Sequence, residues 1–184
     1  MTVSVDPLVV QFNLVHDCIR ACIYIDYIKR KNHKAIAWQS ITDMCSAEAV
    51  ISWNQIFGAN SQDAHWKKLV PKLVEKLPVQ DESRIKPFSK QMITDYLKIS
   101  PKEWENYRRA MVNARNKRLV HFSSDLRPAM PSLTWAQNSC YLYREWLLDL
   151  LAAYQARGLV VRITKTTSPM MIESFKKQIA EVCV

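Results

Sequence analysis

Glycine is the residue that this chain most clearly lacks. Only Gly58 and Gly158 occur among its 184 residues, against an average usage of about 7% in proteins. Walker phosphate loops, dinucleotide-binding turns and the nucleophile elbow of serine hydrolases all need glycines at fixed spacing. None of these patterns can be written in this sequence, so nucleotide binding by a glycine cradle is excluded.

Acidic residues are scarce relative to basic ones. The chain has 26 Lys and Arg against 17 Asp and Glu, a formal net charge of +9. This excess favours an anionic partner, of which nucleic acid is the commonest and an anionic membrane surface the alternative. The charge can also serve solubility alone. No uninterrupted apolar run approaches the roughly 18 residues of a membrane span, and the N-terminus lacks the basic region of a signal peptide. We therefore expect a cytoplasmic protein with no membrane partner.

The cysteines do not form the pattern of a disulfide framework. There are five, an odd number, and all but Cys183 lie in segments with helical periodicity. Cys18 and Cys22 are four residues apart and no second pair follows at zinc spacing, which disfavours a metal site with His16. We expect buried free thiols, no metal and no cofactor.

Hydrophobic periodicity predicts an all-α fold. Apolar residues make up 48% of the chain, enough for one sizeable core. Apolar positions recur at three and four residues in several segments, namely 6–30, 36–57, 63–69, 89–97, 101–121, 133–157 and a last one from Ser168. In the second segment Ile36, Met44 and Trp53 are expected to point inward. The pattern predicts an antiparallel helical bundle over 1–157 and a C-terminal extension over 158–184, packed on the same domain, in which 159–164 fit a short strand.

The helix expected from Pro101 to His121 carries charged residues on its apolar side. An ideal α-helix turns by about 100° per residue, which places Arg115 and Arg118 in the middle of the apolar arc and His121 at its edge. The rest of that arc consists of Trp104, Tyr107, Met111, Ala114 and Phe122. A guanidinium in a core is costly unless it is paired or lines a cavity.

Two structural explanations of these charges stay open beside a functional one. The helix can end before Asn116, where the arc no longer applies. Alternatively, Arg115 or Arg118 can pair with a carboxylate on a neighbouring helix. The candidate carboxylates, for that pairing or for orienting His121, are Asp17, Glu48 and Glu145.

The segment 108–121 is strongly basic. It contains no acidic residue, and its five cations are Arg108, Arg109, Arg115, Lys117 and Arg118. Such a block can hold phosphates as fixed countercharges, although the helix macrodipole also favours cations in the C-terminal half of a helix. His121 adds a group that titrates near neutral pH.

The run Arg115-Asn116-Lys117-Arg118-Leu119-Val120-His121 resembles the R-x(4–6)-H motif of the HEPN superfamily, with five intervening residues and an Asn directly after the Arg. The order of the helices, and the stretch 53–58 followed by His65-Trp66, are similar to the abortive-infection-type branch. The resemblance covers about 7–157. It implies a four- or five-helix bundle that dimerises around the motif helices. It also implies a metal-independent endoribonuclease, serving phage defence or toxin–antitoxin growth arrest.

The resemblance also implies a role for each motif residue. His121 would act as general base or acid on the ribose 2′-hydroxyl and the leaving oxygen, Arg115 would stabilise charge on the phosphoryl group, and Asn116 would orient or bind the phosphate. The candidate RNA contacts are Lys117, Arg118 and Arg108. Because six residues separate Arg115 from His121, they diverge by roughly 120° on an ideal helix, and a two-fold axis can gather both pairs around one cleft.

The expected partners are a second copy of the chain and RNA, with a protein or nucleotidyltransferase antitoxin as a further candidate. Some relatives carry a Tyr two residues after the His as the target of a partner nucleotidyltransferase. Ser123 holds that position here, so the chain departs from that pattern. Because some HEPN proteins are not catalytic, a bundle that binds RNA or a protein is the alternative function, and a basic helical adaptor without RNA contact is a third.

Overall fold

The computed structural model describes residues 6–31, 35–59, 61–75, 85–120, 130–156, 158 and 168–182. Over these residues all regular structure is helical, with seven α-helices and one π-helical turn. The all-α bundle predicted from the hydrophobic periodicity is therefore confirmed. The strand expected over 159–164 lies outside the described residues.

The helices follow the predicted segments closely. In chain order they are α1 (Asp6–Arg30), α2 (Ile36–Phe57), α3 (Trp66–Val74), α5 (Lys90–Leu97), α6 (Pro101–Ala114), the π-helical turn η1 (Arg115–Val120), α7 (Thr134–Ala156) and α8 (Ser168–Val182). Two segments differ. The helix expected over 101–121 is α-helical only to Ala114 and continues as η1, and the segment expected over 63–69 begins at Trp66 and continues to Val74.

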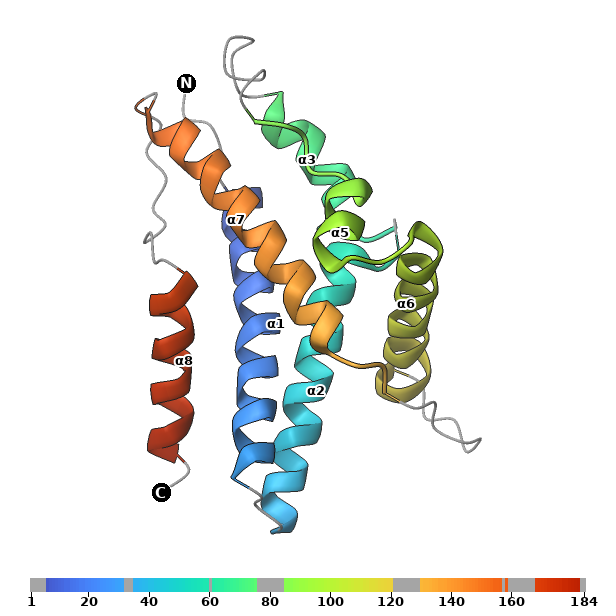
Figure 1. Cartoon of the computed structure of the whole chain (residues 1–184), viewed down its shortest axis with the longest axis vertical. Helices are drawn as coiled ribbons and strands as arrows, with labels where there is room; N and C mark the ends of the chain where they lie inside the picture. Colours follow the sequence, from blue (N-terminus) through green and yellow to red (C-terminus); the bar gives the residue numbers. More distant parts are fainter. Residues whose placement is uncertain are drawn as a thin grey trace.

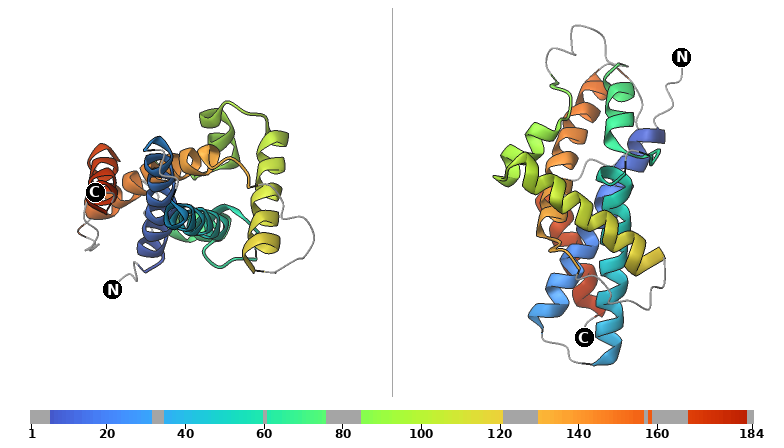
Figure 2. Two further views of the ribbon diagram at one scale, coloured as in Figure 1. Left: turned by 90° about the horizontal axis from the view of Figure 1, so that it is seen from below. Right: turned by 90° about the vertical axis from the view of Figure 1, so that its right-hand side faces the viewer.

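The first two helices, α1 and α2, form an antiparallel hairpin that α7 crosses (Figure 1). On one side of this hairpin α8 lies along α1. On the opposite side α6 stands beside α2 and α5, as the views in Figure 2 show. The motif helix is thus at the edge of the bundle, away from the C-terminal helix.

Aromatic side chains fix α6 to the rest of the bundle. Trp53 of α2 is fully buried, and its ring meets those of Trp104 and Tyr107 edge-on at centroid distances of 5.6 and 5.5 Å. Its indole Nε1 donates to the Ser139 hydroxyl of α7 at 2.9 Å. Tyr107 donates from its hydroxyl to the carbonyl of Ser132 at 2.8 Å. One buried indole thereby joins α2, α6 and α7.

The first helix is apolar enough to satisfy a membrane-span test. By length and composition alone Pro7–Arg30 is a candidate, with a hydropathy of 1.3 over its best window. That window is 56% buried inside the bundle. The core helix of a helical bundle passes the same test, because a helix that is covered on most sides is apolar on most sides.

The first turns of α2 differ from the expectation. Ile36 is 80% exposed and Met44 71% exposed, whereas Trp53 is buried as predicted. The hairpin of α1 and α2 extends beyond the N-terminal end of α7, at Thr134 (Figure 1). Because α7 does not reach this part of α2, its outward side chains stay uncovered.

Candidate functional site

The motif begins where α6 changes from an α-helix to a π-helical turn. At its start α6 has the predicted capping box. The Ser100 hydroxyl accepts from the Glu103 amide at 3.2 Å, and the Glu103 carboxylate accepts from the Ser100 amide at 2.7 Å. The α-helical part ends at Ala114, and η1 begins at Arg115. Arg115 and Asn116 are therefore the first two residues of the π-helical turn.

The predicted apolar arc of α6 is confirmed as far as the described residues allow. The buried side chains are Trp104, Tyr107, Met111 and Ala114. Beyond Ala114 the arc no longer applies, because a π-helix closes hydrogen bonds between residues five apart and turns less per residue. Arg115 and Asn116 are half-buried and Lys117 is exposed. This matches the alternative in which the α-helix ends before Asn116.

A hydrogen bond joins the first two motif residues. The Arg115 Nε donates to the Asn116 side-chain oxygen at 2.9 Å. The bond fixes the plane of the guanidinium through Nε, the nitrogen on the side-chain stem. The two terminal amino groups of an arginine form the fork that grips phosphate oxygens. The arrangement is therefore compatible with phosphate binding by Arg115, with Asn116 as its orienting neighbour.

Two predicted residues cannot be placed. His121, the expected proton carrier, lies outside the described residues, and so does the side chain of Arg118. The structure brings Arg115, Asn116 and Lys117 together in one turn and gives no geometry for the histidine.

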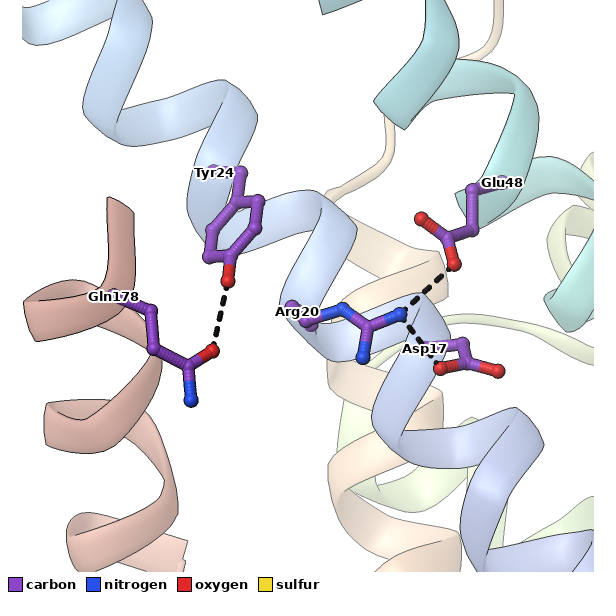
Figure 3. Close-up of polar contacts among 5 residues, drawn as sticks. All are labelled: Asp17, Arg20, Tyr24, Glu48 and Gln178. Carbon is purple, nitrogen blue, oxygen red and sulfur yellow. Dashed lines mark hydrogen bonds and ion pairs between the residues drawn. The ribbon is translucent and has the colours of Figure 1, made fainter. Parts of the chain in front are cut away.

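The three candidate carboxylates bind other described groups. Asp17 and Glu48 both accept from Arg20, at 2.8 and 2.9 Å, which ties α1 to α2 (Figure 3). Glu145 pairs with Arg144 at 3.3 Å. These ion pairs stabilise the bundle away from η1.

Arg108, a predicted RNA contact, is held between α6 and the end of α2. Its Nε and Nη2 donate to the two carboxylate oxygens of Glu105, at 3.0 and 2.7 Å. Its Nη1 donates to the carbonyl of Gly58 at 2.8 Å. The carboxylate raises the pKa of Arg108, so the guanidinium stays charged. Arg108 and Arg115 are seven residues apart and so share one face of the helix.

Sequence reasoning missed Asn54, which links α2 to the motif. Its side chain is fully buried, and its Nδ2 donates to the carbonyls of Val50 at 2.8 Å and Met111 at 3.0 Å. The amide of Arg115 is bonded to that same Met111 carbonyl. Asn54 therefore helps to fix the position of the Met111 carbonyl, which also accepts the hydrogen bond from the Arg115 amide. A polar residue between the inward-facing Trp53 and Ile56 was the available signal.

Close packing against Asn54 explains why position 58 is a glycine. A Cβ at this position would lie 2.5 Å from the Asn54 carbonyl oxygen and 2.6 Å from its side-chain oxygen. Real Cβ atoms do not approach oxygen so closely, so a side chain here would displace Asn54 or the end of α2. The glycine thus allows the backbone at the end of α2 to approach Asn54 closely.

The two described histidines act as hydrogen-bond acceptors. His16 lies between the rings of Phe12 and Phe175, and its Nε2 accepts from Arg144 at 3.2 Å. Burial and the Arg144 charge lower the pKa of His16 to about 4. The His65 Nδ1 caps α3 by accepting from its backbone, and burial followed by nearby cations lowers the pKa of His65 to about 4. Both rings are neutral at pH 7.

The described cysteines are free and buried, at positions 18, 22, 45 and 140. Within the described part of the chain, no three His, Cys, Asp or Glu side chains gather as a metal site would require. Cys183 lies outside the described residues.

Comparison with known proteins identifies no family for this chain. No protein-family model, curated protein or solved structure matches this chain.

Proposed function

We propose that this protein is a metal-independent endoribonuclease of HEPN type, acting in the cytoplasm in phage defence or growth arrest. The observation that carries the proposal is the hydrogen-bonded pair Arg115–Asn116 at the start of η1. It stands on a basic, half-buried helix face, six residues before His121 in the sequence. The all-helical bundle around it is consistent with the fold that the resemblance implies.

In the proposed reaction the ribose 2′-oxygen attacks the neighbouring phosphorus and the 5′-oxygen leaves. His121 takes the proton of the 2′-hydroxyl or gives one to the leaving oxygen, a contribution of about 10²- to 10⁴-fold in rate. The guanidinium of Arg115 stabilises the charge that builds on the phosphoryl oxygens. Asn116 orients that guanidinium through its bond to Nε. The products are a 2′,3′-cyclic phosphate and a 5′-hydroxyl.

The same proposal includes a homodimer. One histidine in each motif cannot give and take a proton at once, and a two-fold axis brings a second motif to the same phosphate. Apolar side chains that could be buried between copies are present on α2, against which η1 packs. They are Ile36, Met44 and Ile51, at 80%, 71% and 41% exposure. Their spacings of eight and seven residues place them on one side of the helix.

Cleavage of single-stranded RNA in the presence of EDTA tests the proposal. The wild-type chain should release fragments ending in a 2′,3′-cyclic phosphate, and His121→Ala should remove most of the cleavage while the dimer persists in light scattering. Arg109→Ala is the matched control, because Arg109 is exposed and bonds only to Asn106 of its own helix among the described contacts. Full cleavage by a folded His121→Ala protein, or cleavage that EDTA abolishes and magnesium restores, contradicts the mechanism. Binding of RNA without cleavage would favour the non-catalytic bundle.

A further inference from the structure

A small cavity of about 100 Å³ lies between α3, α5 and α6. Three basic side chains line it, each from a different helix: Lys67 of α3, Lys90 of α5 and Arg108 of α6. Its apolar walls include Trp66 and Trp104. Cations from three separate helices converge here because the folded bundle brings together segments that lie far apart in the sequence.

The cavity has an excess of positive charge. Glu105 is its only described acid, and both of its oxygens are bound by Arg108. That pair is neutral as a whole, so the charges of Lys67 and Lys90 are not balanced within the lining. The buried His65 ring also lines the cavity, and the positive charge of the lining affects its pKa. After burial, the cations Lys67 and Arg108 are the largest causes of its lowered pKa.

The volume limits what the cavity can hold. Its volume of about 100 Å³ is well below the roughly 300 Å³ at which pockets for drug-sized ligands begin. A space of this size suits one tetrahedral oxyanion. Lys67 and Lys90 would supply its cationic donors, because the Arg108 nitrogens already donate to Glu105 and Gly58.

The cavity is aligned with the motif along α6. Arg108 and Arg115 lie on one face, seven residues apart, and a rise of 1.5 Å per residue separates them by about 10 Å along the axis. Successive phosphates of a stacked strand advance by roughly 3.4 Å along its axis. A strand that follows this face therefore presents a phosphate to each position a few nucleotides apart.

We infer that the cavity formed by Lys67, Lys90 and Arg108 is a subsite for a backbone phosphate of RNA, a few nucleotides from the phosphate held at Arg115. The inference rests on the proposed ribonuclease function for the identity of the strand. It adds two residues, Lys67 and Lys90, that belong to no motif in the sequence.

The test measures binding without chemistry. A single-stranded 2′-O-methyl RNA lacks the attacking hydroxyl, so it binds without being cleaved. Its affinity is measured by fluorescence anisotropy between about 50 and 300 mM salt, a range in which added salt weakens phosphate contacts strongly. The test variant is Lys67→Ala with Lys90→Ala. The matched control is Lys72→Ala with Lys102→Ala, which removes two exposed lysines of α3 and α6 that do not line the cavity. Both double variants change the net charge from +9 to +7 (9 − 2).

The test variant should bind about tenfold more weakly at the lowest salt, and its slope of log K against log salt should be shallower by about 0.7, the value for one lost phosphate contact on a single strand. The control should keep the wild-type slope. Equal behaviour of the two double variants overturns the subsite. So does lysine-dependent binding of inorganic phosphate with no lysine dependence for RNA. If the alanine protein does not fold, as judged by circular dichroism, Lys67→Gln with Lys90→Gln replaces it.

The two proposals fail separately. If wild-type protein binds the 2′-O-methyl strand through Lys67 and Lys90 but never cleaves RNA, the subsite stands and the ribonuclease is refuted. If it cleaves RNA and the lysine variants bind like the control, the ribonuclease stands and the subsite is refuted.

Discussion

Replacing Asn54 by Asp tests how α2 holds the motif helix. The amide Nδ2 of Asn54 donates to two carbonyls, those of Val50 and Met111. A carboxylate has no N–H, so Asn54→Asp would turn a negative oxygen toward both of them. The other side-chain atom, Oδ1, is buried and has no donor in the described structure. The introduced charge would therefore be desolvated and without a stabilising hydrogen bond.

The size and sign of the effect follow from linkage. Burial without a donor raises the pKa of the introduced carboxyl well above its ordinary value near 4 and toward neutrality. Between these values the folded state keeps a proton that the unfolded chain has lost, so the free energy of unfolding falls as pH rises. Each pH unit costs about 1.4 kcal/mol, or about 4 kcal/mol from pH 4 to pH 7. A typical domain has only about 5–15 kcal/mol in total.

Urea unfolding followed by circular dichroism at pH 5, 6 and 7 measures this. Asn54→Ala is the matched control, because it removes the same two hydrogen bonds without adding a charge and should cost about 1–3 kcal/mol at every pH. The difference in unfolding free energy between the two variants should widen as pH rises. A constant difference across the three pH values would show that the position is hydrated or has a donor, and would refute the buried link between α2 and α6.

Three further predictions concern the motif, the histidine beside α8 and the start of α6. Arg115→Lys should reduce RNA cleavage nearly as much as Arg115→Ala, because lysine keeps the charge but lacks the planar fork; near-normal turnover of the lysine variant in a cleavage assay would contradict this. His16 has a folded pKa of about 4, below its ordinary value, so its stabilising contribution is present above about pH 6.5 and lost as pH falls toward 4. The loss should be about 1–2 kcal/mol after allowance for solvent screening, and His16→Gln, which keeps an acceptor for Arg144, should remove that acid dependence in urea unfolding at pH 7 and 5. Ser100→Ala removes one half of the capping box and should cost about 1 kcal/mol, a fall of about 2–4 °C in melting temperature; an unchanged melting temperature would mean that the N-terminus of α6 contributes nothing to folding.

The sequence was sufficient where local chemistry decides the structure. The start of α6 was predictable because Ser100, Pro101 and Glu103 satisfy the free amides of a first turn by themselves. The end of α2 was predictable because a glycine follows its last apolar residue, although the capping glycine has φ −72°, not the left-handed conformation. Both signals lie within a few residues of the boundary that they mark.

Features set by packing were not predictable. The exposure of Ile36 and Met44 depends on where α7 begins, which no periodicity within α2 can reveal. The change to a π-helical turn at Arg115 falls where η1 packs against α2, and an arc drawn for an ideal α-helix cannot anticipate it. The bonds of Arg108 to Gly58 and of Asn54 to Met111 join positions 50 and 57 residues apart.

The proposed roles of the basic side chains separate binding of the strand from catalysis. Contacts to a phosphate that is not cleaved are equally strong in the ground state and in the transition state, so on their own they lower KM without raising kcat. Lys67 and Lys90 would make contacts of that kind. Arg115 would act on the phosphate whose charge changes during the reaction, so its contribution would appear in kcat. Arg108, which lines the cavity, and Arg115 stand on one continuous helical segment that Trp53 and Asn54 fix to α2, so the spacing of these two arginines is set before a strand binds. A strand bound in the cavity would thereby present its reacting phosphate to Arg115 in a fixed register, and only this positioning, not the remote contact itself, would contribute to kcat.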